Sequence, residues 1–170
     1  MDILSPMLAR IDKRALLEAV VDQLAEAVAD STARARATAA SATHEEARPE
    51  DAKDTRALEE TYLARGQAAR VAELQLDLAT LRHLELQSFE GGRAAAATAL
   101  IRIEDADGAP RVVFLVPRAG GRKLTFGGVE ISLTTPASPL GRKLVGSEVD
   151  DEIQLVIKGR TRVWSVIEVT

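Results

Sequence analysis

The first half of the chain repeats apolar residues at the spacing of a helix seam. Leu17, Val21, Leu24 and Val28 recur at intervals of 4, 3 and 4 residues. A helix uses this spacing to place apolar side chains along one face, as in a coiled coil. No glycine or proline interrupts residues 9–48. The pattern therefore predicts one long helix here.

A second apolar seam follows a break in the helical pattern that contains Pro49. Residues with the same 3 and 4 spacing predict an apolar face on a second helix. Leu58 and Tyr62 lie nearer the break, and we expect them to pack in the seam. The clearest seam positions are Val71, Leu74, Leu78 and Leu81.

The two seams can be tested for antiparallel packing, because paired positions in such a hairpin have a constant sum. Val28 with Leu74, and Leu24 with Leu78, both give 102. The turn should then centre on Asp51, which lies in the Pro-Glu-Asp sequence of the break. The sequence predicts an antiparallel helical hairpin, with arms of about 35 residues that are roughly 50 Å long.

The apolar period changes to two in the second half of the chain, which indicates strands. Ser138 and Pro139 have the residue types of a helix cap and first helical position. The expected fold is α+β, with a coiled-coil hairpin at 1–88 and an antiparallel sheet packed on one short helix at 92–170. The expected strands are 99–104, 111–116, 123–126, 129–134, 151–158 and 161–169, and the helix is 138–145.

Composition and charge narrow the functional classes. The chain has no cysteine, so disulfides and cysteine-ligated zinc are excluded. No apolar run is long enough for a membrane span, and we expect a cytoplasmic protein with no signal peptide. The net charge of −4 argues against indiscriminate nucleic-acid binding. It is compatible with a protein that binds the machine that holds the nucleic acid.

The break between the helices is rich in carboxylates. Residues 1–90 carry 11 Lys and Arg against 17 Asp and Glu, whereas residues 91–170 carry 11 against 9. Taken alone, acids in a helical turn keep it soluble and favour the N-terminus of the second helix. The acidic residues of this predicted tip, near residues 45–54, are Glu45, Glu46, Glu50, Asp51 and Asp54.

The second half also carries a longer motif. Ser138-Pro-Leu-Gly-Arg-Lys-Leu-Val-Gly146, followed by Glu148-Val-Asp-Asp-Glu152 and a closing hairpin, resembles the FKBP-like C-terminal domain of the Gre transcription elongation factors. That family has a Ser-Pro-(Ile/Leu)-(Gly/Ala)-Arg-Ala-Leu-hydrophobic-Gly-Lys-x-x-Gly-Asp signature. Its domain follows an antiparallel coiled coil with an acidic tip, so the resemblance covers essentially the whole chain. The sequence departs at Lys143, where the family often has Ala, and at Asp150, where it usually has Gly.

The tip resembles the family less closely. The family string is Gly-Asp-Leu-Ser-Glu-Asn-Ala-Glu-Tyr, in which an Asp and a Glu lie three positions apart. The nearest counterpart is Asp51-Ala-Lys-Asp54, which keeps two acids at that spacing but shortens the second. The chain is therefore similar to a divergent member of the GreA/GreB-like transcript cleavage factors.

The resemblance implies a factor that inserts its hairpin into the secondary channel of bacterial RNA polymerase and stimulates cleavage of backtracked RNA at its 3′ end. The polymerase would perform the reaction, so no independent enzyme activity is expected. Asp51 and Asp54 would be the catalytic, metal-directed pair, with Glu50 and Glu46 as substitutes. They would act on a Mg²⁺ ion shared with the polymerase, and no cofactor is expected on the protein alone.

Other implied contacts lie on the arms and on the second domain. The resemblance implies transcription elongation and regulation, RNA polymerase and DNA binding, and a monomer that is not attached to a membrane. The arginines expected to contact polymerase or RNA are Arg34, Arg36, Arg56, Arg65 and Arg70. The loop and helix expected to dock on the polymerase comprise Ser138, Pro139, Leu140, Gly141 and Arg142.

Two alternatives remain open on the sequence. The divergent tip is compatible with a secondary-channel regulator or inhibitor that binds the polymerase without stimulating cleavage. An alternative of another class is an FKBP-like prolyl isomerase or chaperone. The low aromatic content counts against it, because we expect Phe114, Phe126 and Trp164 to lie in the core.

Overall fold

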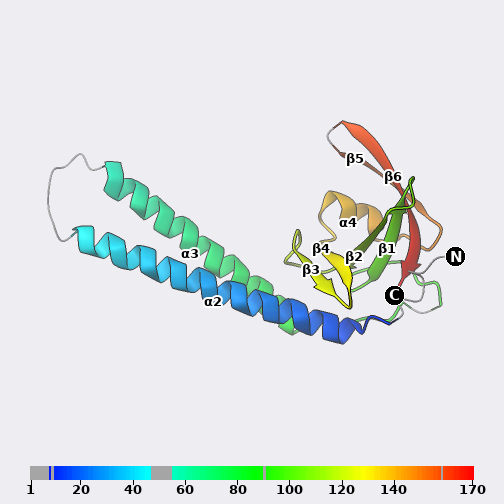
Figure 1. The fold of residues 1–170 in the computed structure, drawn as a ribbon, viewed down its shortest axis with the longest axis horizontal. Coiled ribbons are helices and arrows are strands. Elements are labelled where there is room, and N and C mark those ends of the chain that lie inside the picture. The colour runs from blue at the N-terminus through cyan, green and yellow to red at the C-terminus, as the bar shows by residue number, and fades with distance from the viewer. Residues whose placement is uncertain (1–7, 9, 47–54, 90, 158) are drawn as a thin grey trace. The chain divides into compact units, whose positions relative to one another are not determined.

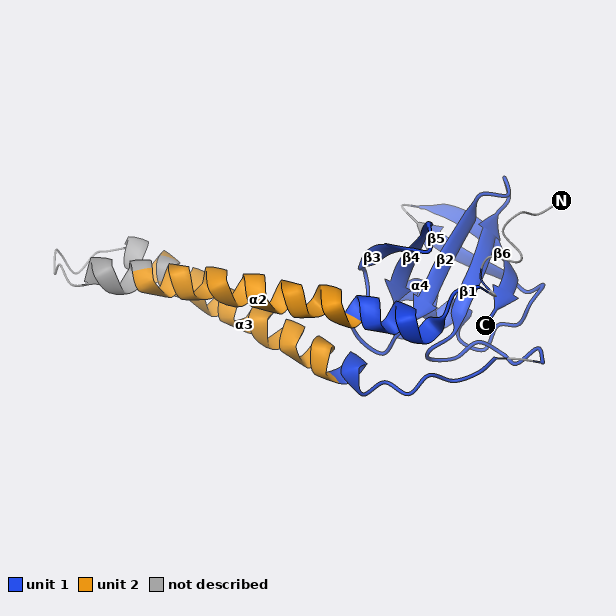
Figure 2. Cartoon of the chain, turned by 60° about the horizontal axis from the view of Figure 1, so that its bottom comes forward, with its two compact units in different colours: residues 1–20, 80–170 blue, residues 21–79 orange. Residues whose placement is uncertain are grey.

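The computed structural model describes residues 8, 10–46, 55–89, 91–157 and 159–170, with side chains throughout except at 41–46, 55–57, 60 and 157. The chain divides into two compact units, shown in Figure 2. The sheet unit contains residues 1–20 and 80–170, and the helical unit contains residues 21–79. The ends of the long helices thus group with the sheet, whereas the sequence analysis assigned them to the hairpin. No helix among the described residues is long and apolar enough to cross a membrane.

Two long helices form the first half of the chain. Helix α2 spans Lys13–Glu46 and helix α3 spans Thr55–Arg82, and the two run antiparallel (Figure 1). The Asp12 carboxylate starts α2 as an N-cap, because its Oδ1 accepts hydrogen bonds from the backbone N–H groups of Arg14 at 2.8 Å and Ala15 at 3.2 Å. The helices end on either side of the predicted centre at residue 51, which confirms the predicted hairpin.

Burial along the helical unit is concentrated at one end. Leu24 is 0% exposed, and Leu74 and Leu78 are also buried, as the seam predicts. Val28 and Val71 are half-buried, and no side chain described between 31 and 40 or between 58 and 70 is buried. The distal part of the hairpin therefore has little apolar packing of its own.

The predicted seam was wrong at Leu58 and Tyr62, and burial at its other end is wider than the seam alone. Leu58 and Tyr62 are 57% and 63% exposed, because at 3.6 residues per turn they lie on the side of α3 opposite to Leu74 and Leu78. At the other end, Leu16 and Val20 are fully buried in addition to Leu17. This end of α2 belongs to the sheet unit and buries a second face there.

The second half forms one six-stranded sheet with the order β3-β4-β2-β1-β6-β5. The antiparallel sheet expected from the sequence is in fact mixed, because β2 and β4 pair in parallel. Strand β3 lies at the edge of the sheet, and β4 lies between β3 and β2. Because β3 and β4 are antiparallel, β4 runs in the same direction as β2. The strands are β1 Leu100–Asp105, β2 Pro110–Leu115, β3 Lys123–Phe126, β4 Val129–Thr134, β5 Glu152–Ile157 and β6 Arg160–Val169.

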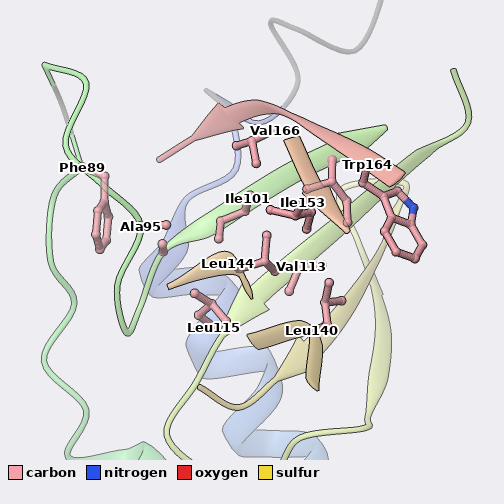
Figure 3. Close-up of a cluster of buried hydrophobic side chains, with 12 residues drawn as sticks. Phe89, Ala95, Ile101, Val113, Leu115, Leu140, Leu144, Ile153, Trp164 and Val166 are labelled. Atoms are coloured by element: carbon pink, nitrogen blue, oxygen red, sulfur yellow. The ribbon is translucent and has the colours of Figure 1, made fainter. Parts of the chain in front are cut away.

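One face of the sheet packs on the short helix α4, Pro139–Leu144, as predicted. Leu140 and Leu144 of this helix join Ile101 and Val113 in a buried apolar cluster (Figure 3). Trp164 lies at one end of that cluster. The opposite face is also buried, since neighbouring residues on each central strand are inaccessible. The residues Leu100, Ile101, Arg102, Ile103, Val112, Val113, Phe114 and Leu115 are all buried.

Candidate functional site

The predicted metal-directed carboxylates lie, in sequence, within the connection between α2 and α3 or at the end of α2. Glu50, Asp51 and Asp54 lie outside the described residues, and Glu46 is the last residue of α2, with its side chain also outside them. In the part of the chain that the structure describes, no group of three His, Asp or Glu side chains is arranged to hold a metal ion. The metal-directed role of the tip stays a prediction.

The predicted arginines lie along the hairpin arms. Arg34 and Arg36 of α2 and Arg65 and Arg70 of α3 are all exposed, and the side chain of Arg56 lies outside the described residues. Their local interactions are weak. Arg34 Nε donates to the Asp30 carbonyl at 3.4 Å. Arg70 pairs with Glu73 at 3.2 Å with both side chains in solvent, where an ion pair contributes little stability.

The seam register predicts where these arginines lie along the hairpin. A constant sum of 102 places Arg34 and Arg36 opposite residues 68 and 66, which lie between Arg65 and Arg70. The four arginines would then form a belt at one level of the hairpin. Arg34 and Arg36 lie on different faces of α2, since two residues turn a helix by about 200°. Positive charge is thus distributed around the hairpin rather than along one side.

The predicted docking motif begins with a helix cap. Ser138 Oγ accepts a hydrogen bond from the Gly141 N–H at 3.0 Å and donates one to the Thr135 carbonyl at 2.8 Å. Pro139 occupies the first turn, where its missing N–H costs nothing. A side chain on Gly141 would place a Cβ atom 1.9 Å from the Thr135 carbonyl oxygen. Local geometry therefore requires glycine at position 141, and it favours a cap residue at 138 and allows proline at 139.

This geometry limits which docking residues can reach a partner. Leu140 and Gly141 are buried, whereas Pro139 and Arg142 are exposed. The Arg142 guanidinium donates to the Ala137 carbonyl at 2.8 Å, which holds it beside the turn. Pro139 and Arg142 thus form the accessible part of the motif.

The departure at Asp150 also has a structural explanation. Asp150 has a φ of +73°, a left-handed conformation that glycine adopts without steric cost and that aspartate tolerates better than most residues. The backbone N–H of Asp150 bonds to the Val166 carbonyl at 2.9 Å, which fixes the turn before β5. The positive φ explains why glycine suits this place in the motif. Aspartate preserves the turn with some backbone strain.

Charged side chains inside the sheet unit were not anticipated from the sequence. Arg102 is 1% exposed on β1 and forms an ion pair with Glu104. Burial raises the pKa of Glu168 on the neighbouring strand, and the positive charge of Arg102 partly opposes this rise. The register pairs Arg102 with Glu168 directly across the two strands. The alternation of β1 places Arg102 on the face opposite to Ile101 and Ile103, but nothing local in the sequence indicates that this face is covered or identifies the partners of Arg102.

Lys13 ties the first turn of α2 to the segment that follows α3. Its Nζ donates to the Gln87 carbonyl at 2.7 Å and to the Thr98 carbonyl at 3.4 Å. The ammonium also lies 4.8 Å from the centre of the Phe89 ring, within range of a cation–π interaction. Burial lowers the pKa of Lys13. The Lys13 side chain thus joins the start of α2 to residues 87–89 and to Thr98. These contacts are consistent with a structural role for Lys13.

A cavity of about 550 Å³ was also missed by the sequence analysis. It lies on the α4 side of the sheet and is lined by Arg111, Arg122 and Lys123, together with Leu140 and Trp164. These residues come from separate parts of the chain, so no local motif could have identified the cavity.

The aromatic residues expected in the core are Phe114, Phe126 and Trp164. Phe114 and Trp164 are buried, as expected, and Phe126 is half-buried.

Comparison with known proteins gives structural neighbours only. No family model and no curated protein sequence matches the chain. The crystal structure of Thermus aquaticus Gfh1 aligns at 17% identity with a TM-score of 0.39, covering 87% of this chain and 92% of the other. GreA factor homolog 1 (Gfh1) of Thermus thermophilus aligns at 17% identity with a TM-score of 0.38, covering 88% of this chain and 94% of the other. The prokaryotic transcription elongation factor GreA/GreB from Nitrosomonas europaea aligns at 19% identity with a TM-score of 0.36, covering 57% of this chain and 78% of the other.

Proposed function

We propose that this chain is a Gre-like transcription factor that binds bacterial RNA polymerase by inserting its helical hairpin into the secondary channel. The observation that carries the proposal is the pair of long antiparallel helices, α2 and α3, which end at Glu46 and Thr55 on either side of an acid-rich segment. The distal arms bury almost nothing internally, so their surfaces are available to a surrounding partner.

The chemistry proposed for the tip follows from its carboxylates. Asp51 and Asp54 are the metal-directed pair, and Glu50 and Glu46 are the substitutes. Carboxylate oxygens are hard ligands, and Mg²⁺ typically takes one or two of them while it keeps several waters. The ion, held by the polymerase, supplies charge stabilisation at the cleaved phosphodiester. The contribution of this chain is to bring carboxylates to that ion and to orient water beside it.

The second part of the proposal concerns how the sheet unit docks. Pro139 and Arg142 project from a turn that Ser138 and Gly141 hold rigid. A rigid, exposed proline next to a cation suits contact with an acidic or neutral protein surface. The buried members of the motif support that turn and do not themselves contact the polymerase.

A second candidate function is regulation of the polymerase without cleavage. It is favoured by the tip sequence, because Asp54 is one methylene shorter than the glutamate of the family string and the rest of that string is absent. A shorter side chain at the second position reaches less far toward a metal ion held by another protein. Such a factor would occupy the channel and slow elongation instead of rescuing backtracked complexes.

The two functions are separated by adding the protein to a stalled, backtracked elongation complex with labelled RNA. Transcript cleavage predicts short 3′ fragments, and Asp51→Asn with Asp54→Asn should abolish them while leaving polymerase binding intact. The matched control is Asp22→Asn with Asp30→Asn, which removes two exposed carboxylates from α2 away from the tip. This control should cleave like the wild-type protein.

The remaining outcomes are equally informative. Slower elongation without cleavage would favour the regulator. Unchanged cleavage by the double Asn variant would move the site to Glu50 or Glu46. Failure to compete with a known secondary-channel factor, together with no effect on transcription, would overturn the proposal. Prolyl isomerase activity under those conditions would support the alternative of another class.

A further inference from the structure

The cavity on the α4 side of the sheet has a consistent chemical character. Strand alternation and register place its side chains on one face, since Arg111 pairs with Ile103 and Ser132 pairs with both Val113 and Lys123. Ile103 and Val113 belong to the buried cluster beneath α4. The basic side chains Arg111 and Lys123 therefore lie on the same side of the sheet as α4.

The cavity floor is apolar. Trp164 pairs with Ile153 of the same cluster and is only 6% exposed. Leu140 from α4 and Leu155 from β5 line the cavity beside it. A volume of about 550 Å³ is typical of a small-molecule site, which usually combines an apolar wall with a few polar groups that fix orientation.

All the charged residues that line the cavity are positive. Its three cationic residues are Arg111, Arg122 and Lys123, and no carboxylate belongs to the lining. Lys123 is partly neutralised by Glu130, whose Oε1 lies 2.7 Å from Nζ. Within the described part of the chain, Arg111 and Arg122 form no ion pair with a carboxylate. Two arginines are thus left to recognise an anion, for which the planar guanidinium is well suited.

Hydroxyl groups add to this polar side. Ser132 and Thr134 of β4 line the cavity and are buried. Hydroxyls and arginines together are typical partners of phosphate oxygens, because each oxygen accepts several hydrogen bonds. We propose that this cavity is a binding site for a small phosphorylated molecule with an apolar or planar body, the phosphate lying at Arg111 and Arg122 and the body against Trp164 and Leu140.

This site does not rest on the chemistry proposed for the tip, because the tip carboxylates lie outside the described side chains and the whole cavity lies within the sheet unit. It does share Ser138, Pro139 and Leu140 with the predicted docking motif, so the variants that test it change Arg111 and Arg122 instead. Loss of ligand binding would leave the polymerase proposal standing, and loss of polymerase binding would leave this one standing.

The only tryptophan of the chain lies in the cavity, so its fluorescence reports on this site alone. The probe is phenyl phosphate, which combines a phosphate with a planar ring, titrated into the full chain at low ionic strength. We expect a saturable change in Trp164 fluorescence. Inorganic phosphate and neutral benzyl alcohol each carry only half of the recognised features, and both should bind more weakly.

Variants test the assigned roles. Arg111→Gln and Arg122→Gln should each weaken phenyl phosphate binding about tenfold or more, as expected for loss of a hydrogen bond to a charged group. The matched control is Arg14→Gln, which removes the same charge from an exposed position of the sheet unit outside the cavity, and its affinity should be unchanged. Circular dichroism of each variant establishes that it is folded.

Three results would overturn the proposal. The first is no saturable response to phenyl phosphate. The second is equal affinity in the wild-type protein and in both cavity variants. The third is saturation by a neutral proline-containing peptide without saturation by phenyl phosphate, which would make the cavity a peptide site.

Discussion

In the sheet unit both faces of the central strands are buried, whereas in the helical unit burial is confined to one end. Phe114, Ile103 and Val166 are inaccessible in the sheet unit. In the helical unit Leu24, Leu74 and Leu78 are the buried side chains among those described, and the more distal positions are partly or fully exposed. The sheet unit is held by its own core. The distal hairpin is held mainly by helix formation and is suited to packing within another molecule.

Two glycines test this contrast most strongly. Gly141→Ala forces a Cβ atom to within 1.9 Å of a backbone oxygen, and we expect it to destabilise the sheet unit by about 3 kcal/mol or more. Gly66→Ala in α3 meets nothing within 4 Å and should stabilise the helical unit by about 0.8 kcal/mol. Denaturation followed by Trp164 fluorescence reports the first, and circular dichroism reports the second. Equal effects of the two substitutions would contradict the contrast.

Two leucines test it within the hairpin. Leu24→Ala removes a fully buried side chain and should cost about 2–3 kcal/mol, near the lower end for such substitutions because a two-helix interface relaxes readily. Leu58→Ala, at 57% exposure, should change stability by less than about 0.5 kcal/mol. Helical circular dichroism during urea denaturation measures both. A large loss from Leu58→Ala would show that the distal seam is packed.

Much of this contrast could be predicted from the sequence. The large seam residues Leu24, Leu74 and Leu78 give way to small ones toward the tip, and the seam register located the break. Ser138 and Pro139 predicted the start of α4, because cap and first-turn residues act locally. These features depend on neighbours within a few residues or on a simple repeat.

The errors arise where distant segments decide the outcome. Leu58 and Tyr62 were assigned to the seam by hydrophobicity, although the helical phase carries them to the other face. The parallel β2–β4 pair depends on where the β3–β4 hairpin inserts, which no local pattern specifies. Arg111, Arg122 and Trp164 are brought together only by the folded sheet, so the cavity had no sequence signal. The metal-directed role of Asp51 and Asp54 stays a prediction.

A turn in the sheet unit offers a smaller test. Asp150→Gly replaces a residue held at a φ of +73° by one that adopts this conformation freely, and glycine also makes the unfolded chain more flexible. The steric gain should exceed that entropic cost by about 0.5 kcal/mol. Thermal denaturation followed by Trp164 fluorescence should show a small rise in Tm. A fall would mean that the aspartate side chain itself stabilises the turn.

The smallest expected effect is a pH dependence confined to the sheet unit. Because burial raises the folded-state pKa of Glu168 above its usual value of 4.5, the folded state binds its proton more readily than the unfolded state. Glu168 therefore contributes stability that appears as the pH falls through the raised pKa and is complete below 4.5. Glu168→Gln should lose this gain in stability as the pH falls toward 4.5, as measured by urea denaturation. Glu148→Gln, at an exposed position, should keep it.

The proposed function requires the segment between α2 and α3 to reach the active centre of RNA polymerase. The chain has no cysteine, so Asp51→Cys provides a unique attachment point for an iron chelate that cuts nearby protein and nucleic acid. If the proposal is right, we expect cuts next to the catalytic metal of the polymerase and at the RNA 3′ end. Glu26→Cys, about 30 Å along α2 from its last residue, Glu46, at 1.5 Å per residue, should cut elsewhere. Cutting from Asp51→Cys only at the outer surface of the polymerase would contradict it.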